Sequence, residues 1–153
     1  MKIFGYILAF LGILTFLALY IIGSIAPETS VYLGRQVPKK YVEEIKDLKL
    51  LRHGEKIVYF YSDGFIDIKD GMYFVTDQNV VAYNNLWEEP ETIIPFETID
   101  SLSVDYDDSF LEDSYIFIRT LDGLEVTFPV SSERNRDKIF YEFIRKRLSE
   151  SSI

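Results

Sequence analysis

Carboxylates gather most densely between residues 105 and 113 of this 153-residue chain. The stretch reads DYDDSFLED, and its acidic residues are Asp105, Asp107, Asp108, Glu112 and Asp113. Hard cations such as calcium take several oxygen ligands, which raises a cation-binding hypothesis, but no glycine stands where an EF-hand loop needs one. A solvated acidic loop, or a docking surface for a basic protein partner, accounts for the same residues. We predict partner docking and no metal site.

A second candidate contact is the pair Leu86 and Trp87, which lies in a polar loop between two asparagines and two glutamates. Trp87 is the only tryptophan of the chain. Large aromatic side chains are enriched among the residues that dominate protein interfaces. Trp87 either contacts a partner or folds back onto its own domain, and the sequence leaves both open. We predict that Leu86, Trp87 and the acidic cluster together form the partner-binding surface.

Catalytic sets are missing from the sequence. His53 is the only histidine, there is no cysteine, and no nucleophile motif or glycine-rich phosphate loop accompanies them. His53 falls in a turn, where an exposed or backbone-bonded imidazole is expected. We predict a protein that is not an enzyme, with no catalytic residues and no cofactor.

The charge distribution points to the class of partner. Residues 53–130 carry three Lys/Arg against seventeen Asp/Glu, within a chain whose formal net charge is −9. Such a surface repels phosphate backbones, so we predict no nucleic-acid partner. An alternative hypothesis is a lipid-sensing module, in which the flanking basic residues meet anionic headgroups. The residues of this alternative are Arg35, Lys39, Lys40, Arg145, Lys146 and Arg147.

The chain opens with an uncharged run over residues 3–27. About twenty apolar residues in a helix match the hydrocarbon thickness of a bilayer, so we predict a transmembrane anchor at residues 1–26. The length of the run and Pro27 argue against a cleaved signal peptide. The positions of Lys and Arg favour a single-pass protein of the cell membrane with a cytoplasmic C-terminal domain. Gly5 and Ala9 add the hypothesis of a homo-oligomer formed through this helix.

The remaining patterns predict a juxtamembrane linker with a short amphipathic helix at 27–49, then a series of strands, then a C-terminal helix. The short helix either packs on its own domain or lies near the membrane. The C-terminal helix has a cap at Ser131 or Ser132 and an apolar stripe. The predicted strands span 56–61, 65–68, 72–76, 80–83, 91–94, 99–106, 115–120 and 124–128, with Pro129 ending the last.

Several local motifs carry a family resemblance: LLRHGEKI at 50–57, YFVTD at 73–77, VVAY at 80–83, Ile94-Pro95 before Ile99, and Asp122-Gly123 before the last strand. In this order they resemble the pleckstrin-homology-like superfamily, and within it the bacterial PH-like and GRAM-like domains. The resemblance covers roughly residues 50–148, and we predict a PH-like domain at 50–149 with a tail at 150–153.

The resemblance implies a mainly β fold, a bent antiparallel barrel of about seven strands with a C-terminal helix. It also implies a non-enzymatic binding or scaffold protein, which we expect to dock a protein partner at the membrane. Phosphoinositide-binding members use a basic cluster around the first inter-strand loop. The matching stretch 62–70 holds Asp63, Asp67 and Asp70 against Lys69, which argues against phosphoinositide recognition.

Overall fold

The computed structural model describes residues 2–25, 30–109 and 112–151. Its helices are α1 (Lys2–Ile25), α2 (Lys39–Asp47) and α3 (Arg136–Ser151), with short 3-10 turns η1 (Gly34–Gln36), η2 (Ile68–Asp70), η3 (Phe96–Thr98) and η4 (Glu133–Asn135). Its strands are β1 (Tyr32–Leu33), β2 (Ile57–Ser62), β3 (Met72–Thr76), β4 (Asn79–Tyr83), β5 (Glu91–Pro95), β6 (Ile99–Asp105), β7 (Asp113–Thr120) and β8 (Glu125–Ser131).

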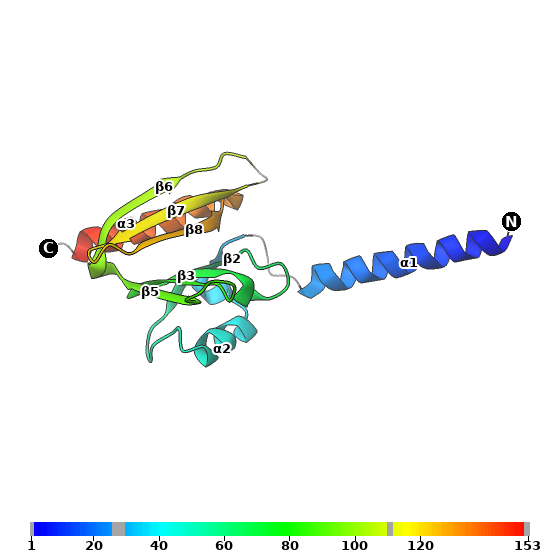
Figure 1. The fold of residues 1–153 in the computed structure, drawn as a ribbon, viewed down its shortest axis with the longest axis horizontal. Helices are drawn as coiled ribbons and strands as arrows, with labels where there is room; N and C mark the ends of the chain where they lie inside the picture. Colours follow the sequence, from blue (N-terminus) through cyan, green and yellow to red (C-terminus); the bar gives the residue numbers. More distant parts are fainter. Residues whose placement is uncertain (1, 26–29, 110–111, 152–153) are drawn as a thin grey trace.

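The strands form two antiparallel sheets, ordered β1-β2-β3-β4-β5 and β6-β7-β8. Figure 1 shows the two sheets facing each other, with α2 on the outer side of the five-stranded sheet. The predicted hairpin over residues 72–83 is confirmed as β3 and β4, in which Phe74 lies opposite Val81. Every residue of these two strands is buried, because the sheet is covered on both faces.

Two hydrophobic clusters hold the layers together. Between the sheets, Phe128 of β8 stacks on Tyr73 of β3 at 5.4 Å, and Phe140 of α3 lies 6.2 Å from Phe128 between ring centroids. On the other face, Tyr41 of α2 stacks on Phe60 of β2 at 5.9 Å. The amphipathic helix therefore packs on its own domain, which is one of the two predicted alternatives.

Two details of the predicted strands are wrong. Residues 65–68 form no strand, because the Asp67 side chain accepts a 3.0 Å hydrogen bond from the Lys69 N–H and turns the chain into η2, leaving Phe65 71% exposed. Pro129 does not end the last strand, since β8 continues to Ser131. β8 pairs only with β7, and a sheet tolerates proline in an edge strand.

The predicted helix cap also differs. Ser131 is the last residue of β8, and α3 begins only at Arg136, after the turn η4. Arg134 and Asn135 have φ angles of 61° and 55°, in the left-handed region that non-glycine residues rarely adopt. Residues 132–135 form a turn between β8 and α3, and the helix begins after it.

The predicted membrane anchor requires a correction. α1 (Lys2–Ile25) extends away from the sheets (Figure 1). Within the described part of the chain, no helix has both the length and the apolar character needed to cross a bilayer. This finding overturns the predicted transmembrane helix at residues 1–26 and, with it, the single-pass location with a cytoplasmic domain.

Candidate functional site

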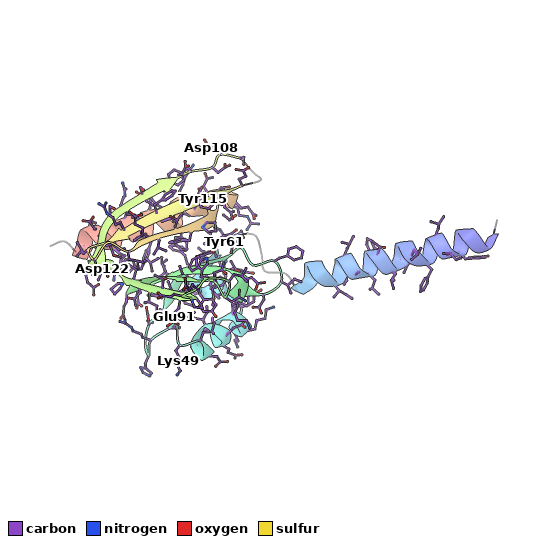
Figure 2. The ribbon with its side chains drawn as sticks, viewed as in Figure 1. Lys49, Tyr61, Glu91, Asp108, Tyr115 and Asp122 are labelled. Carbon is purple, nitrogen blue, oxygen red and sulfur yellow. The ribbon has the colours of Figure 1, made fainter. Side chains whose placement is uncertain are left out.

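An acidic pocket of about 570 Å³ lies at one end of the sandwich, where the connection between β6 and β7 meets η4 and the start of α3. Figure 2 shows Asp108 on that connection, with Tyr61 on the facing sheet. Two cations, Arg134 and Lys138, also line the pocket. Its carboxylates are Asp107, Asp108, Glu112, Asp113, Glu133 and Asp137. Anionic groups therefore outnumber cationic ones by six to two.

The base of the acidic pocket contains a buried carboxylate, Asp137 in the first turn of α3. Only 2% of this residue is exposed. The hydroxyl of Ser114 donates a 2.6 Å hydrogen bond to Asp137 Oδ2, and the N–H of Asp107 donates to Ser114 Oγ at 3.1 Å. Asp137 Oδ1 has no hydrogen-bond partner among the described residues. A buried acceptor in this condition costs about 1–3 kcal/mol, so the site favours a donor.

Two tyrosine–aspartate pairs stand beside this base. Tyr61 Oη donates to Asp113 Oδ2 at 2.6 Å, and Tyr73 Oη lies 3.5 Å from Asp63 Oδ2. Burial raises the pKa of both carboxyls, and the charge of Asp113 adds to the rise at Asp63. Burial, and next the hydrogen bond to Asp113, raise the pKa of the Tyr61 phenol. Tyrosine hydroxyls donate to both carboxylates, and a backbone hydrogen bond also favours the ionised form of Asp63.

Gly71 makes room for Asp63. A Cβ built at position 71 would lie 1.8 Å from Asp63 Oδ1 and 3.1 Å from Tyr73 Oη. The Ser62 hydroxyl donates to the Gly71 carbonyl at 2.6 Å, which ties the two ends of the β2–β3 connection together. The position of the Asp63 carboxylate therefore depends on the absence of a side chain at 71.

The pocket's own cations are engaged away from its base. Arg134 Nε lies 3.4 Å from Glu133 Oε1. Lys138 Nζ donates to Asn135 Oδ1 at 3.0 Å and lies 5.8 Å from the ring centre of Tyr106. Across the described residues, no ion pair reaches the other five carboxylates of the pocket. The left-handed backbone of Arg134 and Asn135 forms the wall here, and such conformations cluster at binding sites.

The structure brings four of the five predicted acidic residues into the pocket: Asp107, Asp108, Glu112 and Asp113. Asp105 is not among the lining residues and is exposed at the end of β6, opposite Tyr115. No three His, Asp or Glu side chains in the described part of the chain are placed to hold a metal ion. His53 is exposed.

The two residues of the predicted contact pair, Leu86 and Trp87, differ in burial. Leu86 is 82% exposed, whereas Trp87 is partly buried against the core, with its ring centre 6.5 Å from that of Tyr73. Trp87 N–H donates to the Asn84 carbonyl at 3.1 Å, which fixes the loop backbone. Trp87 thus packs partly on its own domain, and its contact with a partner stays a prediction.

The basic residues of the lipid alternative lie in two groups. In α3, Arg145 pairs with Glu142, while Lys146 and Arg147 approach Glu150 at 3.9 Å and 3.1 Å. The second group lies at η1 and the start of α2 and consists of Arg35, Lys39 and Lys40. In α3, the cations are thus largely neutralised by glutamates of the same helix.

Sequence reasoning missed the residues that make the base of the pocket. In the sequence, Asp137 looks like the acidic residue often found in the first turn of a helix. Tyr61 looks like an aromatic core residue of a strand. Ser114 and Asp137 are 23 positions apart, so no local spacing joins them. Only the antiparallel pairing of β7 with β8, which carries the chain back to the start of α3, brings them together.

Comparison with known proteins supports the fold. No protein-family model and no curated protein matches the chain. Among solved structures, a DUF1696 family protein with a pleckstrin-homology domain from Shewanella loihica PV-4 is 11% identical, with 82% of this chain and 100% of that chain covered and a TM-score of 0.49. A pleckstrin-homology domain from Shewanella amazonensis SB2B is 11% identical, with 72% of this chain and 86% of that chain covered and a TM-score of 0.50. The second of these similarities supports a PH-like fold, as the sequence motifs predicted.

Proposed function

We propose that this protein is a non-enzymatic binding module that docks a basic segment of a protein partner in the acidic pocket. The observation that carries the proposal is the convergence of six carboxylates on one pocket, whose lining cations contact only one of them: Arg134 pairs with Glu133, and Lys138 donates to Asn135. The PH-like fold supports the proposal, because folds of this type present binding sites on a rigid β scaffold.

Electrostatics decides the chemistry of the partner. A concave surface lined by one sign of charge concentrates the field and attracts the opposite charge. Lysine and arginine side chains supply that charge, and arginine adds a planar fork of donors that matches carboxylates. Anionic headgroups and phosphate backbones meet repulsion at the same place. The pairing of Arg145, Lys146 and Arg147 with glutamates favours the protein partner over the lipid alternative.

Titration of the full chain with a lysine- and arginine-rich peptide tests the proposal. A glutamine-substituted peptide of equal length is the control ligand. We expect saturable binding of the basic peptide only, with an affinity that falls as ionic strength rises. Amide resonances of residues 106–109 and 133–138 should shift. Equal binding of the two peptides, or no binding of either, would contradict the proposal.

Matched variants separate the pocket from overall charge. D107N/D108N/E112Q removes three rim carboxylates, whereas E43Q/D47N/E125Q removes three exposed carboxylates elsewhere and changes the net charge equally. We expect the rim variant to weaken binding about tenfold, since each exposed charge contributes up to about 1 kcal/mol. The control variant should change the affinity less than about twofold. Equal losses in both variants would mean attraction to the net charge alone.

A further inference from the structure

We infer that the base of the acidic pocket is a slot for a single guanidinium or ammonium group, contributed by an arginine or lysine of the partner and held between Asp137 and Asp113. The inference rests on the proposed function and deepens it, because it separates a specific anchor at the base from the general attraction of the rim.

Asp137 supplies the main argument. Only 2% of Asp137 is exposed to solvent. Of its two carboxylate oxygens, only Oδ2 accepts a hydrogen bond, from the Ser114 hydroxyl at 2.6 Å. Oδ1 has none among the described residues. Buried charges in folded proteins are normally paired and fully hydrogen-bonded. A cationic N–H donor entering from the pocket would satisfy this oxygen and neutralise the charge at the same time.

Asp113 supplies the second wall of the slot. It precedes Ser114 in β7, and the Ser114 hydroxyl donates to Asp137 of α3, so a hydrogen bond links Asp137 to the strand that carries Asp113. Asp113 is partly exposed and lines the pocket, while the Tyr61 hydroxyl fixes its Oδ2 at 2.6 Å. Two carboxylates held this way match a group with several donors, which describes guanidinium best and ammonium next.

Among the described residues, the cations that line the pocket do not fill the slot. Lys138 and Arg134 are the cations of the pocket lining, and their charged ends contact Asn135 and Glu133 respectively. Tyr61 and Ser114 donate to the two carboxylates, but a hydroxyl brings no positive charge. The base of the pocket is thus built to hold anionic groups in place without neutralising them.

The test uses the full chain and three short peptides that differ at one central residue: arginine, lysine or citrulline. Citrulline keeps the shape of arginine without its charge. We expect the arginine or lysine peptide to bind saturably and the citrulline peptide at least about tenfold more weakly. D137N should weaken the cationic peptide by at least about tenfold, because one partner of a buried charge pair is lost. The exposed variant E125Q should change it less than about twofold.

A measurement on the unmodified protein keeps the test decisive if D137N does not fold. The side-chain carboxyl carbon of Asp137 should shift on titration with the arginine or lysine peptide and stay still with citrulline. Equal binding of the charged and neutral peptides, or an Asp137 carboxyl that does not respond, would overturn the inference.

The two proposals fail in different ways. If a polybasic peptide requires Asp107, Asp108 and Glu112 while D137N has no effect, the slot is refuted and the proposed function stands. If no basic peptide binds the full chain at all, both are refuted.

Discussion

Glu55 and Asp137 are two buried carboxylates in opposite situations. Glu55 is 6% exposed and Asp137 is 2% exposed. Glu55 accepts hydrogen bonds from the Asn79 side-chain amide at 2.6 Å, from the Arg52 N–H at 2.9 Å and from the Thr76 hydroxyl. Asp137 accepts one, from Ser114. Burial alone therefore does not distinguish a carboxylate with a complete set of donors from one with an unused oxygen.

The neighbourhood of each carboxylate explains the difference. Glu55 clamps the turn between β3 and β4, since Thr76 ends one strand and Asn79 begins the next. Its donors come from two separate pieces of chain, Arg52 and the 76–79 turn, and they use both carboxylate oxygens without a ligand. Asp137 lines a pocket with six carboxylates, and only four other lining residues have hydroxyl groups that could donate to them. The first site stabilises the fold, and the second is where a partner can add energy.

The largest expected effect is at Glu55. E55A removes the common acceptor and leaves the Asn79 amide and the Thr76 hydroxyl buried near an empty volume. We expect the free energy of unfolding to fall by about 3 kcal/mol, measured by urea denaturation. D137N should change it by less than about 1 kcal/mol, because the Asn oxygen still accepts from Ser114 and a buried charge is removed. Equal losses in the two variants would break the comparison.

A smaller effect is expected at Tyr61. Y61F deletes the hydroxyl that donates to Asp113 and should lower the free energy of unfolding by about 1 kcal/mol. It should also raise the pKa of the Asp113 carboxyl further, because that hydrogen bond favours the ionised form. Carbon-13 titration of the carboxyl measures the shift. Y59F, on the same strand, is the control, since Tyr59 contacts Phe140 and Phe143 through its ring. An unchanged Asp113 titration in Y61F would contradict the prediction.

The smallest effect is a pH dependence. The pKa of the Asp113 carboxyl is raised in the folded protein, so the folded state holds this proton more tightly than the unfolded state. Stability from this group is present below the unfolded pKa of 3.8 and is lost as pH rises through the higher folded value. D113N removes that loss, so its stability relative to the unmodified protein should rise with pH above 3.8. Urea midpoints at several pH values measure the difference, and a constant or falling difference would contradict the assignment.

Local patterns predicted the elements of the domain well. The β-branched and aromatic runs at 72–76 and 80–83 identify the central hairpin because both faces of those strands are buried. The order of such runs, followed by an amphipathic helix, was sufficient for the PH-like fold. The pattern failed at 65–68, where apolar and acidic residues alternate as in a strand but a side-chain hydrogen bond from Asp67 decides the turn.

Long-range contacts limited the prediction of the site. The acidic run from 105 to 113 was visible in the sequence, and its Asp107, Asp108 and Glu112 supply the rim of the pocket. The base depends on Ser114 meeting Asp137 and on Tyr61 meeting Asp113, which are 52 positions apart. The anchor at 1–26 was inferred from apolar composition alone, and the described part of α1 does not support it. The composition of one segment does not show which residues of distant segments come together in a site.

Gly71 shows how such a relation can depend on a residue that carries no chemistry. The Asp63 carboxylate occupies the space that a methyl group at position 71 would need, 1.8 Å from where its carbon would lie. A change there would rearrange the negative charge beside the pocket without altering the number of charged residues. The net charge of the protein and its number of acidic residues would stay the same after such a substitution. The arrangement of negative charge beside the pocket therefore depends partly on Gly71, a residue that carries no charge itself.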